Sequence, residues 1–210
     1  PDWDDLVFPY DFPPERQPTN LKPRQRLIGE AEFVPVQNQY GGFVYAGATM
    51  AFTTAYWVLG HYNPREIVFL GCDMSYPKAS KTHFYGTGTA DPLREDITLI
   101  SLEAKAARLY ALALAQGCEI TNLSQETSRL IAPRRSLLEP RPKPFKIDKV
   151  QKAHALAREQ ELAYYVASGR YWEELERFDI KQIKRLDALW STVVIAPPQG
   201  AVAPMLSHWI

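Results

Sequence analysis

Residues Ile67-Val68-Phe69-Leu70-Gly71-Cys72-Asp73 carry the clearest indication of a fold in this sequence. A run of β-branched and large apolar residues is typical of a strand buried on both faces of a parallel sheet. Ligands of open α/β sheets bind beyond the carboxyl ends of such strands. Asp73 places a carboxylate at this position, and Gly71 lets the backbone turn or approach a ligand closely.

The segments on either side alternate between strand and helix patterns. The expected elements are a strand over 32–36, a helix over 44–59 that stops at Gly60, a strand over 66–71, a helix over 92–116 and a strand over 118–124. This order predicts right-handed crossovers and a Rossmann-like three-layer α/β core with a mostly parallel sheet, followed by a helical C-terminal region.

The 17 prolines divide the chain. We expect an irregular, Pro-rich N-terminal segment over 1–31, the α/β core over 32–132, a Pro/Arg-rich linker over 133–146 and a helical region over 147–210. The C-terminal helices cover the sheet, form a lid or pair with another subunit in a homo-oligomer, and the sequence leaves these three alternatives open.

Composition excludes some classes of protein. Lys and Arg number 24, as do Asp and Glu, so the net charge of zero argues against broad binding to nucleic acid. The sequence has no apolar run long enough to span a membrane and no signal peptide, which predicts a cytoplasmic protein. Cys72 and Cys118 are expected to be buried free thiols, and no paired-cysteine zinc site is present.

The segment after Asp73 supplies further groups suited to a site. Asp73 could hold a ribose hydroxyl or a metal ion, or could be a turn residue that satisfies nearby backbone N–H groups. His83 could act as an acid, a base or a phosphate partner, or could simply pack in the loop. Tyr85 could stack on a base, and Ser75 is expected to contact phosphate; as a plain alternative, Tyr85 is half-buried.

Two other segments are expected to contribute to the same crevice. Asn122 and Ser124 end the next strand, so they should point toward Asp73. Gly41, Gly42 and Gly47 precede or open a helix, where free N–H groups suit a phosphate, although a tight turn without a ligand is equally compatible with them. We expect Gly42, Asp73, His83 and Asn122 to converge around one pocket.

Four motifs carry a resemblance to known proteins: Gly47-Ala48-x-x-Ala51, the strand ending in Gly71-Cys72-Asp73, Thr82-His83-Phe84-Tyr85-Gly86, and Glu119-Ile120-Thr121-Asn122-Leu123-Ser124. Over about residues 40–132 the chain resembles Rossmann-like bacterial and phage proteins related to motility-accessory (flagellin glycosylation) factors, and archaeal hydroxymethylpterin diphosphokinases. Bacterial sialyltransferases that use CMP-sugars are more distantly similar. Their usual first nucleotide-binding strand has no counterpart before residue 40, so it is lost or lies upstream of Pro1.

The resemblance implies a nucleotide or nucleotide-sugar ligand and a glycosyltransferase-like enzyme. His83 and Asp73 would then be the catalytic residues, with fixed hydrogen-bond donors rather than a metal ion at the departing phosphate. Two alternatives remain: a pterin-type diphosphokinase that uses ATP and Mg²⁺, and a non-catalytic scaffold that retains the fold.

Overall fold

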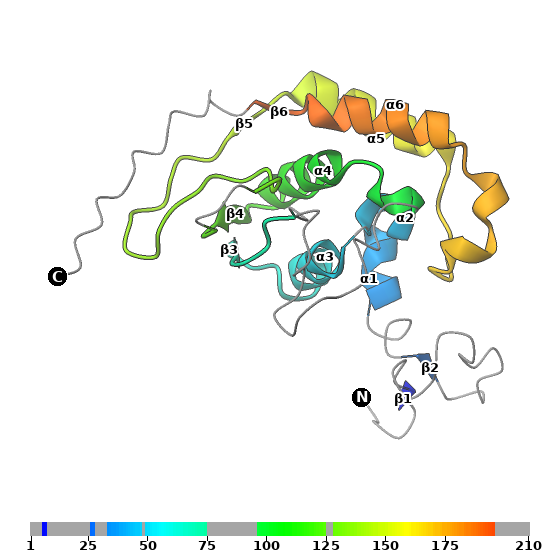
Figure 1. Cartoon of the computed structure of the whole chain (residues 1–210), viewed down its shortest axis with the longest axis horizontal. Helices are drawn as coiled ribbons and strands as arrows, with labels where there is room; N and C mark the ends of the chain where they lie inside the picture. The colour runs from blue at the N-terminus through cyan, green and yellow to red at the C-terminus, as the bar shows by residue number, and fades with distance from the viewer. Residues whose placement is uncertain are drawn as a thin grey trace, which may run out of the picture.

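The computed structural model describes residues 6–7, 26–27, 33–47, 49–74, 96–124 and 128–195 (Figure 1). Its elements are β1 (Leu6–Val7), β2 (Arg26–Leu27), α1 (Val34–Gln39), α2 (Phe43–Ala46), α3 (Met50–Tyr62), β3 (Glu66–Phe69), α4 (Leu102–Ala115), β4 (Glu119–Asn122), β5 (Lys146–Ile147), α5 (Lys149–Leu162), α6 (Ile180–Ser191) and β6 (Val194–Ile195). Short 3₁₀ turns lie at Ile97–Leu99, Tyr171–Glu173 and Leu175–Arg177.

The predicted parallel pairing of the two strands is confirmed, but the prediction that the first is buried on both faces is wrong, because Val68 is 40% exposed. β3 and β4 run parallel, with Glu66 opposite Glu119 and Phe69 opposite Asn122. Within the described residues the other pairs are β1 with β2, which is parallel, and β5 with β6, which is antiparallel. The chain is therefore a mixed α/β protein with a small parallel sheet.

The prediction of a strand over 32–36 is wrong, because α1 forms there. Pro35 lies in the first turn of α1, where its missing N–H costs no helical hydrogen bond. Val36 is buried, and the Gln37 side-chain amide donates to the Thr53 carbonyl oxygen at 2.8 Å. Packing against α3 thus overrides the β preference of the two valines.

The helix predicted over 44–59 is divided into α2 and α3. Gly47 closes α2, and a Cβ there would lie 2.3 Å from the Phe43 carbonyl oxygen. α3 then starts afresh at the N-cap Thr49, whose side chain accepts a hydrogen bond from the Phe52 N–H.

The predicted stop at Gly60 is also wrong, since α3 continues to Tyr62 and ends at Asn63 in the left-handed conformation. A Cβ on Gly60 would lie 2.6 Å from Val36 Cγ1, so this glycine lets α1 approach α3.

The helix predicted over 92–116 is shorter than expected where it is described. The 3₁₀ turn Ile97–Leu99 comes first, and Ser101 caps α4 by accepting from the Ala104 N–H at 3.2 Å. Gly117, with φ of 78°, follows the end of α4.

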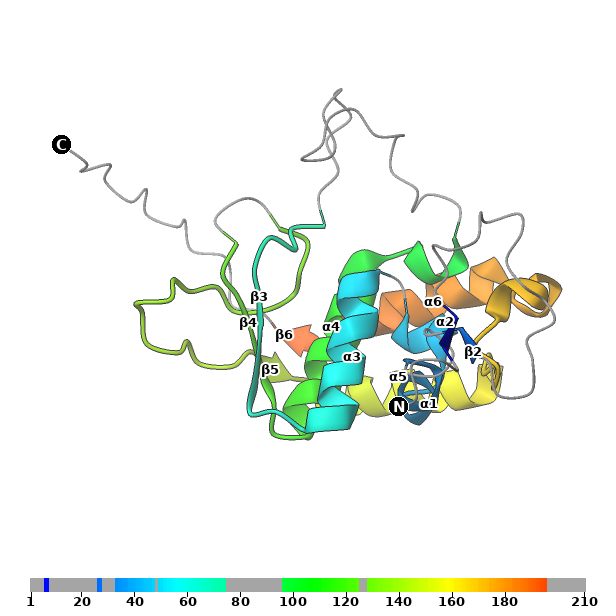
Figure 2. The same cartoon turned by 90° about the horizontal axis from the view of Figure 1, so that it is seen from below.

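α4 is the centre of the fold because it is buried on two faces (Figure 2). Its residues Leu102, Ala106, Leu109 and Ala113 belong to a core shared with α3, β3 and β4. Ala104 and Ala111 belong to a second core shared with α2, α5 and α6. Burial on both faces explains why apolar residues surround most of this helix.

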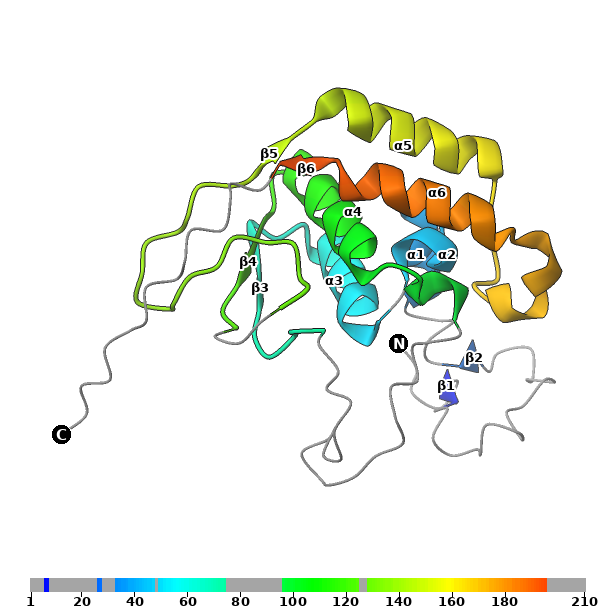
Figure 3. The same ribbon diagram turned by 45° about the horizontal axis from the view of Figure 1, so that its top comes forward.

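The C-terminal helices pack on α4 rather than directly on the sheet (Figure 3). α6 contacts both α4 and α5, with Ile183, Leu186 and Trp190 almost fully buried. β5 and β6 pair where α5 begins and α6 ends, which ties these helices together at one end. No described helix combines the length and apolarity needed to cross a membrane.

Both cysteines are free thiols, as predicted from the sequence, but only Cys118 is buried as expected. Cys118 is fully buried, and burial raises its pKa to about 11, whereas Cys72 is only partly buried. We therefore expect a maleimide to modify one thiol in the native protein and the second only after unfolding. Mass spectrometry of native and urea-treated samples measures this, and two equivalents of label under native conditions would contradict the burial of Cys118.

Candidate functional site

The carboxyl ends of β3 and β4 lie side by side. Asp73 and Asn122 therefore share one edge of the sheet, as predicted. The Leu123 N–H donates to the Phe69 carbonyl oxygen at 2.8 Å, and the Arg129 N–H donates to the Asp73 carbonyl oxygen at 2.8 Å. The loop that follows β4 therefore lies against the end of β3, with Asp73 beside Ser128 and Arg129.

Asn122 organises this loop. Its side chain is fully buried, its Oδ1 accepts from the Ser124 N–H at 2.8 Å, and its Nδ2 donates to Ser128 Oγ at 3.1 Å. Ser128 Oγ also accepts from the Leu130 N–H at 3.1 Å. Asn122 therefore holds the loop in position, and its buried side chain does not face the solvent of the crevice.

Two features of the edge are energetically unfavourable in the chain alone. Ser124 Oγ is buried and has no hydrogen-bond partner among the described residues. Met74, the residue after Asp73, has a φ of 55°, which is uncommon and costly for a side chain with a Cβ. Unsatisfied polar atoms and left-handed backbone both concentrate at functional sites.

The first turns of two helices lie at the same edge. α3 and α4 each run back along the strand that follows them, so both begin near the carboxyl ends of β3 and β4 (Figure 2). Glu103, in the first turn of α4, accepts from Arg129 Nε at 2.6 Å and from Nη2 at 2.9 Å. The hydrogen bonds from Arg129 hold the pKa of Glu103 below its usual range.

Arg129 is a candidate that the sequence analysis missed. Its side chain is 40% exposed, so it can reach a ligand at the edge while Glu103 holds it in place. A planar guanidinium recognises phosphate through paired N–H donors. The only signal in the sequence is its place directly after Ser128.

The Gly41-Gly42 turn does not join this edge. α3 lies between the strands and the α1–α2 turn in both Figure 1 and Figure 2. Gly41 and Gly42 have φ of 89° and 83°, and Cβ atoms there would lie 3.1 Å from Tyr45 Cδ2 and 3.2 Å from Tyr165 Cδ2. α2 has only four residues and offers little helix dipole, so the geometry fits a tight turn without a phosphate.

The remaining predicted site residues are three side chains and two glycines. His83, Tyr85 and Ser75 lie outside the described residues. Gly71 has a φ of 69°, and a Cβ at this position would meet no atom within 4 Å, so the backbone conformation rather than close packing favours glycine there. Gly47 lies between α2 and α3, two residues before the N-cap of α3.

A second polar cluster, which the sequence analysis did not predict, lies between α4, α5 and α6. Arg108 Nε donates to Glu159 Oε1 at 2.7 Å, and Arg108 Nη2 donates to Glu159 Oε2 at 2.8 Å. Trp190 Nε1 also donates to Glu159 Oε1, at 2.7 Å, and Arg108 Nη1 donates to the Tyr56 hydroxyl at 2.9 Å. Burial raises the pKa of Tyr56 to about 12.

A second cation and a second carboxylate are buried beside this pair. Lys105 Nζ donates to the Val44 carbonyl oxygen at 2.7 Å, and burial lowers the pKa of Lys105. Burial raises the pKa of Asp187, which attracts Lys105. Lys105 and Asp187 link α2 and α6 to the central helix α4.

In the part of the chain that the structure describes, no three His, Cys, Asp or Glu residues are grouped as metal ligands would be. Comparison of the chain with protein-family models, curated proteins and solved structures gives no significant match.

Proposed function

We propose that this chain carries a glycosyltransferase-like activity with a nucleotide-sugar donor bound at the carboxyl ends of β3 and β4. The parallel pairing of these strands is the observation that carries the proposal, because it brings Asp73 and the loop after β4 to one edge. Ligands of open α/β sheets bind at such an edge.

The proposal gives each residue at the edge a task. Asp73 accepts hydrogen bonds from sugar or ribose hydroxyls, and the unsatisfied hydroxyl of Ser124 bonds the nucleoside. Arg129 pairs with the donor phosphate. Asn122 keeps the loop in place.

The residues outside the described structure complete the site in this proposal. His83 stabilises the departing phosphate or moves a proton, and Tyr85 and Ser75 contact the nucleotide. The proposal includes a Rossmann-like three-layer core, of which α3, β3, α4 and β4 are the described part.

A thermal-shift panel with CMP, UDP, GDP and ATP, each with and without Mg²⁺, tests the proposal. A nucleotide at 100 times its Kd stabilises the folded state by about 2.7 kcal/mol, which corresponds to a rise in Tm of roughly 5–10 °C for a chain of this size. We expect this shift with CMP, UDP or GDP, whether or not Mg²⁺ is present.

Other results would point elsewhere. A shift that requires both ATP and Mg²⁺ would contradict the proposal and favour the diphosphokinase alternative. The absence of a shift with all four nucleotides would favour a non-catalytic scaffold.

A further inference from the structure

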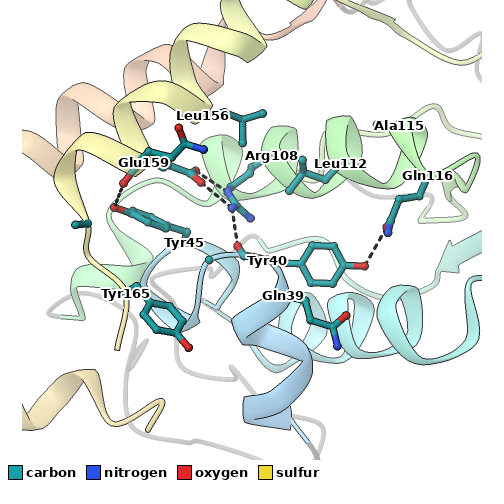
Figure 4. A pocket seen from close by; sticks show the side chains of 13 residues that line it. Gln39, Tyr40, Tyr45, Arg108, Leu112, Ala115, Gln116, Leu156, Glu159 and Tyr165 are labelled. Atoms are coloured by element: carbon teal, nitrogen blue, oxygen red, sulfur yellow. Dashed lines mark hydrogen bonds and ion pairs between the residues drawn. The ribbon is translucent and has the colours of Figure 1, made fainter. Parts of the chain in front are cut away.

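A pocket of about 640 Å³ opens between the α1–α2 turn, α4 and α5 (Figure 4). Its volume is in the range of small-molecule sites. Tyr40 and Gly41 line it from the turn, Leu112 from α4, and Leu156 and Glu159 from α5. The strand-end crevice lies beyond α3 from this turn, so the pocket is a separate place in the fold (Figure 2).

The lining of the pocket has no net charge. Its charged side chains are Arg108 and Glu159, which are 3% and 7% exposed and are paired with each other. A ligand with a net charge would lose its hydration without gaining a counter-charge. The pocket therefore suits a neutral ligand, and phosphates are disfavoured.

The walls of the pocket are mainly aromatic and aliphatic. Figure 4 shows the rings of Tyr40, Tyr45 and Tyr165 and the side chains of Leu112 and Leu156 around the space. Aromatic rings stack on such walls in offset or edge-to-face arrangements. A planar ring is the shape that these walls favour.

At the base of the pocket, the donors of Arg108 and Tyr45 that face it are engaged, whereas Glu159 has an acceptor to spare. Arg108 Nη2 already donates to Tyr40 O and to Glu159 Oε2, and Nη1 points to Tyr56, which does not line the pocket. The Tyr45 hydroxyl donates to Glu159 O and accepts from the Tyr164 N–H.

Glu159 Oε2, in contrast, has one partner among the described residues and lies beneath Gly41, 3.9 Å from the position of a Cβ there. A carboxylate oxygen has two lone pairs, so Oε2 can accept one more hydrogen bond.

We propose that this pocket binds a neutral, planar aromatic compound that donates an N–H or O–H hydrogen bond to Glu159. The ring lies among Tyr40, Leu112 and Leu156, and its donor reaches Oε2. Gly41 has only a hydrogen where another residue would carry a Cβ 3.9 Å from Oε2, which leaves room for a small donor beside that oxygen.

Indole and benzofuran form a matched pair of probes, since they have the same bicyclic shape and only indole has an N–H. Saturation-transfer NMR titrations with the full chain measure both affinities. A hydrogen bond to a charged group predicts that indole binds about tenfold more tightly or better. Equal affinities, or no saturable indole signal, would overturn the proposal.

Variants locate the binding site. Ala115→Trp and Gln160→Trp fill the pocket from α4 and α5, from positions that are exposed in the native chain. Both should abolish indole binding. Ala153→Trp, at an exposed position on α5 that does not line the pocket, is the matched control and should bind indole as the parent does. Unchanged binding in both filling variants would place indole elsewhere and overturn the proposal.

Discussion

Replacement of Glu159 with leucine is expected to lower the free energy of unfolding by about 3–5 kcal/mol. The leucine leaves the guanidinium of Arg108 buried without its partner carboxylate, and Arg108 is 3% exposed. It also removes the acceptor of the Trp190 indole N–H. The rings of Tyr45, Tyr56 and Trp190 lie 5.5–5.9 Å from the guanidinium carbon, but cation–π attraction replaces only part of the lost pairing.

Urea denaturation of the parent and two further variants tests this expectation. Glu161→Leu on the same helix removes an exposed carboxylate that pairs with Arg158, and it should cost at most about 1 kcal/mol. The double variant Arg108→Met/Glu159→Leu should recover much of the loss, because it buries no unpaired charge. If Glu159→Leu costs no more than Glu161→Leu, the buried pair does not stabilise the contact between α4 and α5.

The sequence could not reveal this pair. Arg108 and Glu159 are 51 residues apart, and each stands in a helix with other charged residues. Leu102, Leu109 and Ala113 mark an apolar face of α4 in the sequence, but the fold also buries a second face that includes Lys105 and Arg108. Only the packing of α5 and α6 against α4 makes these charges interior.

Parts of the fold were predictable because local pattern and tertiary packing agree. β3 contains the apolar run Ile67-Val68-Phe69, and it pairs in parallel with β4 as expected. α1 was not predictable, since Val34 and Val36 favour a strand and only contact with α3 through Gly60 makes the helix the better choice. The end of α3 was not predictable either. Gly60 permits the close approach of α1 but resembles a helix stop in the sequence, whereas the helix ends at Asn63.

The sequence predicted which residues lie at the strand ends of the candidate site, but it did not predict the loop conformation or the ion pair around them. Asp73 follows β3 and Asn122 ends β4, so their common edge follows from parallel pairing. The interior role of Asn122 depends on the conformation of the loop that follows it. Arg129 acquires its place from the Glu103 ion pair, which joins residues 26 apart.

Substitution of His83 by alanine is expected to lower turnover by about 10²–10⁴-fold with little change in nucleotide binding. This prediction follows from the proposed function, in which His83 moves a proton or stabilises the departing phosphate. Asp73→Asn should instead weaken nucleotide binding by about 1.5–3 kcal/mol, because it removes a charge-assisted hydrogen bond to a hydroxyl of the donor. The two variants therefore separate catalysis from binding.

Release of nucleotide from CMP-, UDP- and GDP-sugars gives turnover, and the thermal shift gives binding. His154→Ala, an exposed histidine on α5, is the matched control for His83→Ala and should behave as the parent in both measurements. Cooperative unfolding of all three variants should be measured alongside, so that a loss of turnover or binding is not a loss of the fold. If His83→Ala and Asp73→Asn turn over and bind as the parent does, Asp73 is a turn residue and His83 a packing residue. That outcome would contradict the proposed function, because neither turnover nor nucleotide binding would depend on Asp73 or His83.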